Sequence, residues 1–284
     1  LIVCALCLIA SMAMGALMGC SSSDGAGTSS PSGAQSGASD EGTTSGPAYA
    51  EPSTVTLSAF NAQAATAVGP GFIDASNVSL GYVGASVTSN SRCKFQVISG
   101  DMSYNYDIPS DGTPIIAPIN MGSGSYTFRL MQNTSGSNYA ELGSLPVNVQ
   151  LESEFAPFLR PNIFCEYNET SACVTKAFEL AANAQNQGDV VRDIYEWVVR
   201  SIDYDTNKAS QLASTTGYIP NPDDTLSSGY GICFDYASLA AAMFRSLGIP
   251  CQIVTGYVQP DDLYHAWNMI YIDGSWVSAM ITVD

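Results

Sequence analysis

The sequence has few basic residues and only one histidine. Nine lysines and arginines stand against 26 aspartates and glutamates, which gives a formal net charge of −17 at pH 7. Such a chain repels phosphate backbones and lacks the charge on which nucleic-acid binding depends. One histidine and scattered cysteines also lack the paired spacings of a zinc site. We therefore expect no nucleic-acid partner, no metal and no cofactor.

What the sequence does have is enough apolar residues for a folded protein. Its 284 residues leave room for two ordinary domains, and a hydrophobic fraction of 46% can supply a core to each. The sequence therefore predicts a globular protein, and its organisation has to be found along the chain.

The beginning of the chain has the composition of an export signal. Residues 1–19 are uncharged and rich in Leu, Ile, Ala and Met, and Cys20 is followed by three serines. The run Leu17-Met18-Gly19-Cys20 resembles a lipobox, at which a signal peptidase leaves a cysteine that carries diacylglycerol. We expect residues 1–20 to be a lipoprotein signal peptide and acyl chains such as palmitate on Cys20 to hold the protein at the extracytoplasmic face of the cell membrane. A secreted protein with an ordinary cleavage site is the alternative. Because no basic residue precedes the apolar run, we also expect this end to be incomplete.

Two segments of different composition follow. Residues 21–52 are mostly Ser, Gly, Thr and Ala, which cannot bury enough apolar surface to offset chain entropy, and we expect a disordered tether. Residues 53–153 have short runs of period-two alternation between clusters of turn residues, which predicts an Ig-like β-sandwich. The alternating runs are Val55-Leu57, Cys93-Phe95-Val97, Tyr126-Phe128-Leu130 and Val147-Val149.

After residue 153 the apolar spacing becomes helical. One helix is predicted from near Ser171 to Ala181, and a second begins near Asp189. The polar stretch that ends at Leu226 is expected to be a loop. From Cys233 onward apolar residues recur in steps of three and four and predict a third helix with one buried stripe, followed by Gly248 and Pro250. Its stripe residues are Tyr236, Ala237, Ala240, Phe244 and Leu247.

Cys233 stands on the first turn of this third helix. A thiol there is close to unpaired N–H groups and to the positive end of the helix dipole, which favour thiolate. The dipole contributes only about 0.3–1 kcal/mol, so a cationic partner is needed. His265, the only histidine, lies in a predicted strand that ends at Ile272 and can supply the imidazolium. Cys233 and His265 are therefore the predicted catalytic pair. Asp235 is interpreted as a residue that complements the helix dipole.

Several motifs occur in the order found in one enzyme superfamily. Gly231-x-Cys233-x-x-Tyr-Ala, Leu247-Gly-Ile-Pro, Val254-x-Gly-Tyr and His265-Ala-Trp resemble the core of the transglutaminase-like superfamily from about residue 174 onward. The resemblance implies that residues 154–284 form an α+β, papain-like domain with a Cys-His-Asp triad. In this chain the β-domain precedes it. It carries the nucleophile to Cys233 and the base to His265.

The third triad residue does not carry over. The common pattern places an aspartate four residues after Trp276, where this sequence has Met280. In relatives with a longer hairpin the Asp-Pro-Thr motif lies further on, so we expect the domain to be truncated at its C-terminus. The other interpretation is a damaged triad in which Asp284 substitutes or the domain only binds.

The expected function is that of a surface-anchored thiol enzyme acting on amide or peptide bonds through a Cys233 thioester, either a peptidase or amidase or an acyl transferase for protein glutamine. Its partners would be protein or peptide substrates, including cell-wall peptide. The alternative is a catalytically inactive transglutaminase-like lipoprotein for binding or adhesion. Trp267 lines the cleft or belongs to the core, and Cys165 and Cys173 form a loop-closing disulfide or stay free thiols.

Overall fold

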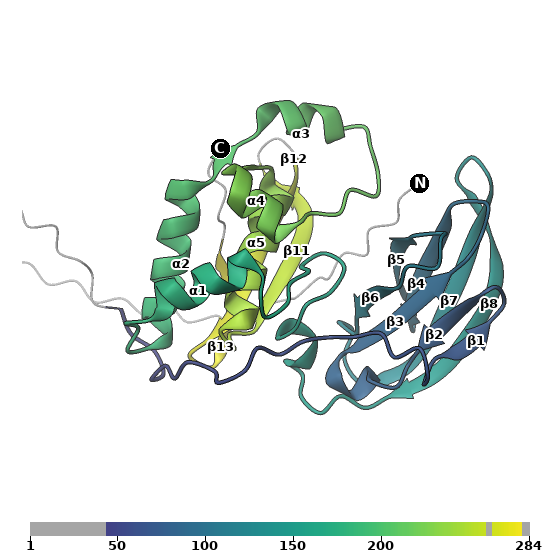
Figure 1. The fold of residues 1–284 in the computed structure, drawn as a ribbon, viewed down its shortest axis with the longest axis horizontal. Helices are drawn as coiled ribbons and strands as arrows, with labels where there is room; N and C mark the ends of the chain where they lie inside the picture. The colour runs from purple at the N-terminus through teal and green to yellow at the C-terminus, as the bar shows by residue number, and fades with distance from the viewer. Residues whose placement is uncertain (1–43, 260–262, 280–284) are drawn as a thin grey trace, which may run out of the picture. The chain divides into compact units, whose positions relative to one another are not determined.

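The computed structural model describes residues 44–259 and 263–279, and the first part of this range forms two sheets (Figure 1). Each sheet has four strands, in the orders β1-β2-β3-β6 and β5-β4-β7-β8, and all pairings are antiparallel. The strands are β1 (Thr66–Val68), β2 (Gly71–Asp74), β3 (Tyr82–Val87), β4 (Cys93–Ser99), β5 (Met102–Ile108), β6 (Ile115–Pro118), β7 (Gly124–Ser135) and β8 (Asn138–Val149). Two 3₁₀ turns, η1 (Val78–Leu80) and η2 (Ala156–Phe158), lie before β3 and after β8.

The alternating runs of the sequence become the inner faces of these sheets. In β4, Cys93, Phe95 and Val97 are buried and alternate with half-buried polar residues. Phe95 lies opposite Leu130 of β7, and Val97 lies opposite Phe128. Buried side chains of both sheets belong to one apolar cluster, so the sheets pack face to face as a β-sandwich.

The second part of the chain combines helices with a small sheet. Strands β11-β12-β13 form a three-stranded antiparallel sheet, and the short β9 and β10 pair in parallel. The elements are α1 (Ala172–Ala181), α2 (Gln187–Ser201), β9 (Asp203–Tyr204), α3 (Thr206–Leu212), α4 (Pro222–Ser228), β10 (Tyr230–Gly231), α5 (Cys233–Ser246), β11 (Cys251–Val258), β12 (Leu263–Ile272) and β13 (Ser275–Ala279). A β-sheet region followed by a mixed helical and sheet domain confirms the predicted α+β fold.

The three predicted helices are present with bounds close to those expected. Helix α2 begins two residues before Asp189 because Asn186 caps it: its side chain accepts the Asp189 N–H at 3.0 Å. The Asp189 carboxylate accepts the Asn186 N–H at 3.2 Å and completes a capping box. Helix α5 ends at Ser246, and Gly248 follows with a φ of 76°.

The predicted loop before residue 226 is wrong, because it contains α3 and α4. Asp205 caps α3 by accepting the Lys208 N–H at 2.8 Å. Asn221 caps α4 by accepting the N–H groups of Asp223 and Asp224, and Pro222 stands at its first turn. Each helix has only seven residues, too few for the apolar period to emerge from a polar composition.

Helix α5 is buried on all sides and not along one stripe. Every residue from Asp235 to Ser246 is buried. The helix packs against α1, α2 and α4 and also against β11 and β12. The alanines of Ala240–Ala242 allow this close approach because they add little side-chain volume. The nucleophile predicted from the sequence therefore stands at the end of the central helix of the domain.

The segment before the sandwich lies against the C-terminal domain. The predicted strand at Val55 and Leu57 is wrong, since residues 51–65 contain no strand, and Val55 packs instead against the core around α5. Within the range assigned to the tether, the Tyr49 N–H donates to the Gln185 carbonyl at 3.1 Å, and the Gln187 N–H donates to that of Pro47 at 2.9 Å. Apolar Tyr49 and Val55 thus attach this segment to the domain.

Candidate active site

The chain before Cys233 is shaped by two glycines. Gly229 has a φ of 70° and ends α4 in the left-handed conformation. Gly231 lies so near the next helix that a Cβ atom on it would be 2.8 Å from the Asp235 Cβ atom. Ile232 is extended, with φ −96° and ψ 173°, and Cys233 is the first residue of α5. The Gly-Tyr-Gly approach thus brings a cysteine to a helix N-terminus, as the sequence predicts.

Cys233 differs from the other described cysteines in its exposure. It is half-buried, whereas Cys93 is 2% exposed and Cys165, Cys173 and Cys251 are 0% exposed. Burial raises the pKa of the Cys165 thiol to about 11 and that of the Cys251 thiol to about 12. Cys165 and Cys173 are free thiols in this structure. Among the described cysteines, reagents therefore have their best access to Cys233.

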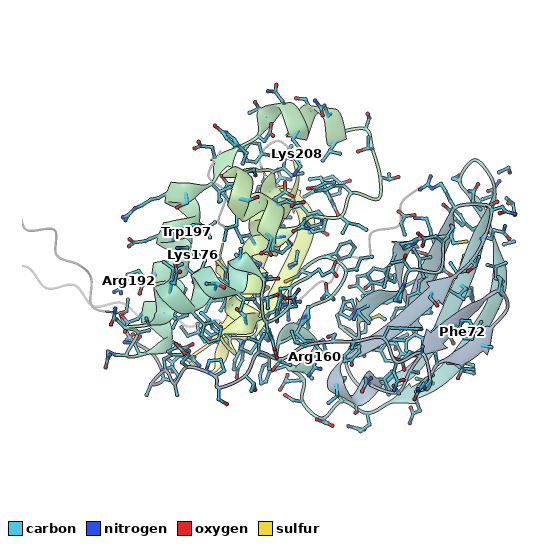
Figure 2. All side chains as sticks on the ribbon, in the orientation of Figure 1. Phe72, Arg160, Lys176, Arg192, Trp197 and Lys208 are labelled. Carbon is cyan, nitrogen blue, oxygen red and sulfur yellow. The ribbon has the colours of Figure 1, made fainter. Side chains whose placement is uncertain are left out.

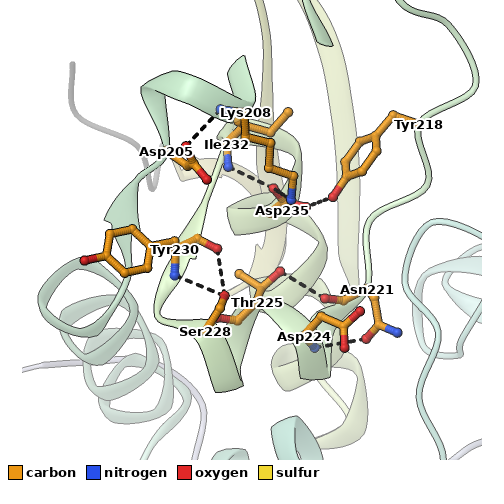
Figure 3. A network of polar contacts seen from close by, with 10 residues as sticks. All are labelled: Asp205, Lys208, Tyr218, Asn221, Asp224, Thr225, Ser228, Tyr230, Ile232 and Asp235. Carbon is orange, nitrogen blue, oxygen red and sulfur yellow. Dashed lines mark hydrogen bonds and ion pairs between the residues drawn. The ribbon is translucent and has the colours of Figure 1, made fainter. Parts of the chain in front are cut away.

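The first turn of α5 holds a fully buried carboxylate. Asp235 is 0% exposed and accepts the Ile232 N–H at 2.9 Å. It supplies one half of a capping box, while Ile232 has no polar side-chain atom to supply the other half. Two further donors from outside α5 reach the same carboxylate, the Lys208 ammonium at 2.7 Å and the Tyr218 hydroxyl (Figure 3). Asp235 therefore does more than complement the helix dipole as predicted, because it also binds Lys208 and Tyr218.

His265 lies near the start of β12 and is 3% exposed. It pairs with Gly256 of β11, and Tyr257 pairs with Tyr264 beside it. Strand alternation places Trp267 on the same face of the sheet as His265. A Cβ atom on Gly256 would lie 3.2 Å from the indole of Trp267, so the indole extends over this glycine. Gly256 thus leaves room for the indole of Trp267 next to the cross-strand pair of Gly256 and His265.

Helix α5 and strand β12 are tied to each other by Asn268. Its Nδ2 donates to the Ala237 carbonyl of α5 at 2.9 Å. Ala237 is one helical turn after Cys233, about 6 Å along the axis, and Asn268 is three residues after His265, about 10 Å along the strand. The short connection from Ser246 to β11 holds the other end of α5 near the end of β12, since Cys251 pairs with Ile270. The beginnings of α5 and β12, with the two predicted catalytic residues, therefore lie at the same end of the domain.

The predicted signal peptide with its lipidation site, and both positions considered for the third triad residue, lie outside the described part of the chain. Cys20, Met280 and Asp284 belong to the ranges 1–43 and 280–284, so the lipidation site and the third triad residue stay predictions. Within residues 44–259 and 263–279, His, Cys, Asp and Glu side chains form no group of three that could hold a metal ion. No helix in these same ranges is long and apolar enough to cross a membrane.

The sequence reasoning missed the polar residues that surround the start of α5. Lys208 and Tyr218 lie in the stretch interpreted as loop, and only the fold brings them to Asp235. The run from Asp205 to Lys208 carries a helix-capping signal that could have revealed α3. Asn268, three residues after the histidine, has no local signal that distinguishes it from an ordinary strand residue.

Comparison with known proteins finds a family model that matches the C-terminal domain. Residues 174–280 match the model of the transglutaminase-like superfamily. An uncharacterized protein of Mycobacterium leprae is 28% identical over 160 residues, which cover 53% of this chain and 52% of that protein. Mouse kyphoscoliosis peptidase is 30% identical over 108 residues, 34% of this chain and 16% of the peptidase. The chain thus spans about half of the first relative and a much smaller share of the second.

A solved structure was also found at low similarity. A candidate cysteine protease from Cytophaga hutchinsonii is 16% identical, with a TM-score of 0.40 over 69% of this chain and 68% of that one. A TM-score of this size adds no argument of its own. The family match rests instead on the segment that contains α1 to β13 with Cys233 and His265. It confirms the recognition made from the sequence motifs and supports the expectation of an enzyme. Residues 174–280 are a transglutaminase-like domain.

Proposed function

We propose that this domain is a thiol enzyme that acts on amide or peptide bonds, with Cys233 as nucleophile and His265 as its base. The observation that carries the proposal is the position of Cys233. It is half-buried on the first residue of the central helix, while the other described cysteines are buried. His265, near the start of β12, lies at the same end of the domain as this helix start. In the proposed enzyme the two side chains meet at this end, where a thiolate and an imidazolium would activate each other.

The proposed reaction forms and breaks one bond at a time. The Cys233 sulfur attacks the carbonyl carbon of the amide, and N–H groups at the start of α5 stabilise the negative charge that develops on the oxygen. The C–N bond then breaks as His265 donates its proton to the leaving amine, which leaves a thioester on Cys233. In the second half His265 takes a proton from the acceptor, the acceptor attacks the thioester, and the C–S bond breaks to restore the thiolate.

The acceptor decides between the two enzyme classes. Water gives hydrolysis and a free acid, whereas a primary amine gives a new amide. The relative named as a peptidase matches over only 108 residues, 16% of its own length, and so does not decide between the two acceptors. We therefore rank a peptidase or amidase level with an acyl transferase.

We also propose that the enzyme works at the cell surface. The lipobox-like run ending at Cys20 supports a lipid anchor at the extracytoplasmic face of the membrane, with peptides, including those of the cell wall, as substrates. The net charge of −17 argues against nucleic acid as a partner. Mass spectrometry of the protein from its own cells tests the anchor: we expect the N-terminal peptide to begin at an acylated Cys20, and an unmodified peptide would contradict it.

The test of activity is capture of the thioester. The full chain is incubated with a library of peptide amides, with and without a primary amine probe, and intact mass is measured after acid quenching. We expect an acyl adduct on Cys233 that is absent from Cys233→Ala and retained in Cys93→Ala, whose cysteine is buried in the sandwich. Absence of any adduct or product across the library would favour the inactive binding module.

A further inference from the structure

A negative charge stands close to the proposed nucleophile. Asp235 follows Cys233 by two residues, is 0% exposed, and points its carboxylate at the Ile232 N–H, just before the cysteine. At a separation of about 8 Å and an effective dielectric constant of about 20, a like charge disfavours a thiolate by roughly 1.5 pH units. An uncompensated Asp235 would therefore oppose the ionisation that the reaction needs.

Lys208 supplies the compensating charge. Its ammonium is 2.7 Å from Asp235 Oδ2, and its side chain is 31% exposed, so the pair is partly shielded from water. Burial alone would lower the pKa of Lys208, but its hydrogen bonds to Asp235 and Tyr218 outweigh this effect and hold it above the ordinary value. The lysine therefore stays charged throughout the neutral range.

The position of Lys208 is fixed from several directions. Its own N–H is bound by the Asp205 carboxylate at the start of α3 at 2.8 Å (Figure 3). Its ammonium lies 4.8 Å from the centre of the Tyr218 ring. Burial raises the pKa of Tyr218 to about 12, with the bond to Asp235 adding to this, so the hydroxyl remains a donor. The contacts join α3 and the loop before α4 to the start of α5.

The other titratable groups at this end define the charge balance. His265 comes from β12, and Asp203 and Tyr204 come from β9, the strand that pairs with β10 just before Cys233. Asp205 precedes α3 and binds backbone rather than the ammonium of Lys208. Lys208 is thus the cation that the described contacts place beside the first turn of α5.

We propose that Lys208 and Asp235 are a positioning pair for Cys233. Asp235 fixes the backbone before the nucleophile, and Lys208 cancels the charge that this carboxylate would otherwise exert on the thiolate. In this proposal Lys208 acts through Asp235 and not on the substrate, and it is required for the reactivity of Cys233 at neutral pH. The inference rests on the proposed role of Cys233 as nucleophile.

The experiment measures the rate of Cys233 alkylation by iodoacetamide in the full chain as a function of pH, with peptide mass spectrometry to assign the site. Lys208→Met leaves Asp235 uncompensated and is expected to raise the midpoint of the profile by about 1–2 pH units. Asp235→Asn leaves the lysine uncompensated and is expected to lower it. The double variant is expected to return close to the parent midpoint.

The opposite signs distinguish charge balance from damage to the fold. If both single variants move the midpoint in the same direction, or Lys208→Met leaves it unchanged, the inference is overturned. Should Lys208→Met fail to fold, Asp235→Asn decides alone, because a midpoint at or above the parent value contradicts the pair. A parent protein whose Cys233 titrates like an ordinary thiol overturns the proposed function instead.

Lys176 provides the matched control. Its side chain is 33% exposed, close to that of Lys208, and it also pairs with a carboxylate, that of Glu179. Its ammonium lies 6.0 Å from the centre of the Trp197 ring on α2, away from α3 and Lys208 (Figure 2). Lys176→Met is expected to leave the alkylation profile unchanged. A shift as large as that of Lys208→Met would show that loss of any such lysine has this effect and would refute the assignment.

Discussion

Replacement of Asn268 is expected to affect the stability of the protein and the reactivity of Cys233 differently. Its Nδ2 donates to Ala237, while its buried Oδ1 has no hydrogen-bond partner among the described residues. Replacement by leucine, similar in volume, loses the hydrogen bond to Ala237 and two longer ones, to Cys251 Sγ and the Gln252 carbonyl at 3.4 Å, together worth about 1–2 kcal/mol. It also removes an unpaired oxygen that costs about 1–3 kcal/mol. We therefore expect Asn268→Leu to change the free energy of unfolding by about −1 to +2 kcal/mol, as measured by urea denaturation.

The same substitution is expected to impair the site. Asn268 is the described side-chain link between β12, which carries His265, and α5, which carries Cys233. Without it the two elements lose their fixed register, and the alkylation rate of Cys233 at pH 7 should fall by about tenfold, since small misplacements cost large factors in rate. Asn120→Leu is the control, because Asn120 also has a buried Oδ1 without a described partner but lies beyond β6 in the sandwich. A loss of more than about 2 kcal/mol of stability in Asn268→Leu, or an unchanged alkylation rate, would refute the reasoning.

Three further perturbations test other parts of the account. Phe244→Ala removes a 0% exposed ring from the middle of α5 and is expected to cost about 3–5 kcal/mol in urea denaturation, and a cost below about 1 kcal/mol would contradict the core assignment. Gly231→Ala brings a Cβ atom to 2.8 Å from that of Asp235, so the backbone before the nucleophile must shift, and we expect a slower alkylation of Cys233 in a protein that still folds. An alkylation rate equal to that of the parent would show that the close approach is unimportant. Burial raises the pKa of Cys165 to about 11. The unfolded thiol loses its proton from about pH 8.5, whereas the folded one keeps it. The contribution of Cys165 to the free energy of unfolding is therefore fully present below about pH 8.5 and falls by about 1.4 kcal/mol per pH unit up to about pH 11. Cys165→Ala should reduce this slope between pH 8 and 10, and an identical slope would exclude Cys165 as its source.

The long elements could be predicted because their patterns span several periods. The alternation in β4 and β7 and the spacing from Cys233 to Leu247 are determined by which face is buried, and burial leaves its mark on the sequence. Cys233 at a helix start followed from local signals, namely two glycines before it and Gly248 after Ser246. The prediction that α5 buries a single stripe was wrong, because the helix is buried on all faces. A sequence with small alanines between larger apolar residues does not reveal whether one face of the helix is covered or all of them.

The short and long-range features could not be predicted in the same way. Helices α3 and α4 depend on caps rather than on period. Val55 was assigned to a strand because a short alternation also fits a loop in which one apolar side chain is partly buried. The contacts of Lys208 and Tyr218 with Asp235 join residues 27 and 17 positions apart, which no local pattern encodes. The polar environment of the site is therefore a product of the tertiary fold.

The central claim is that Cys233 and His265 form an activated pair. The most direct measurement is the pH profile of Cys233 alkylation in the full chain compared with that of His265→Ala. A free cysteine would give a midpoint of about 8.5. We predict a midpoint well below this in the parent and a return toward about 8.5 in His265→Ala. A profile centred near 8.5 in both proteins would contradict the account and leave Cys233 without the activation that a nucleophile needs.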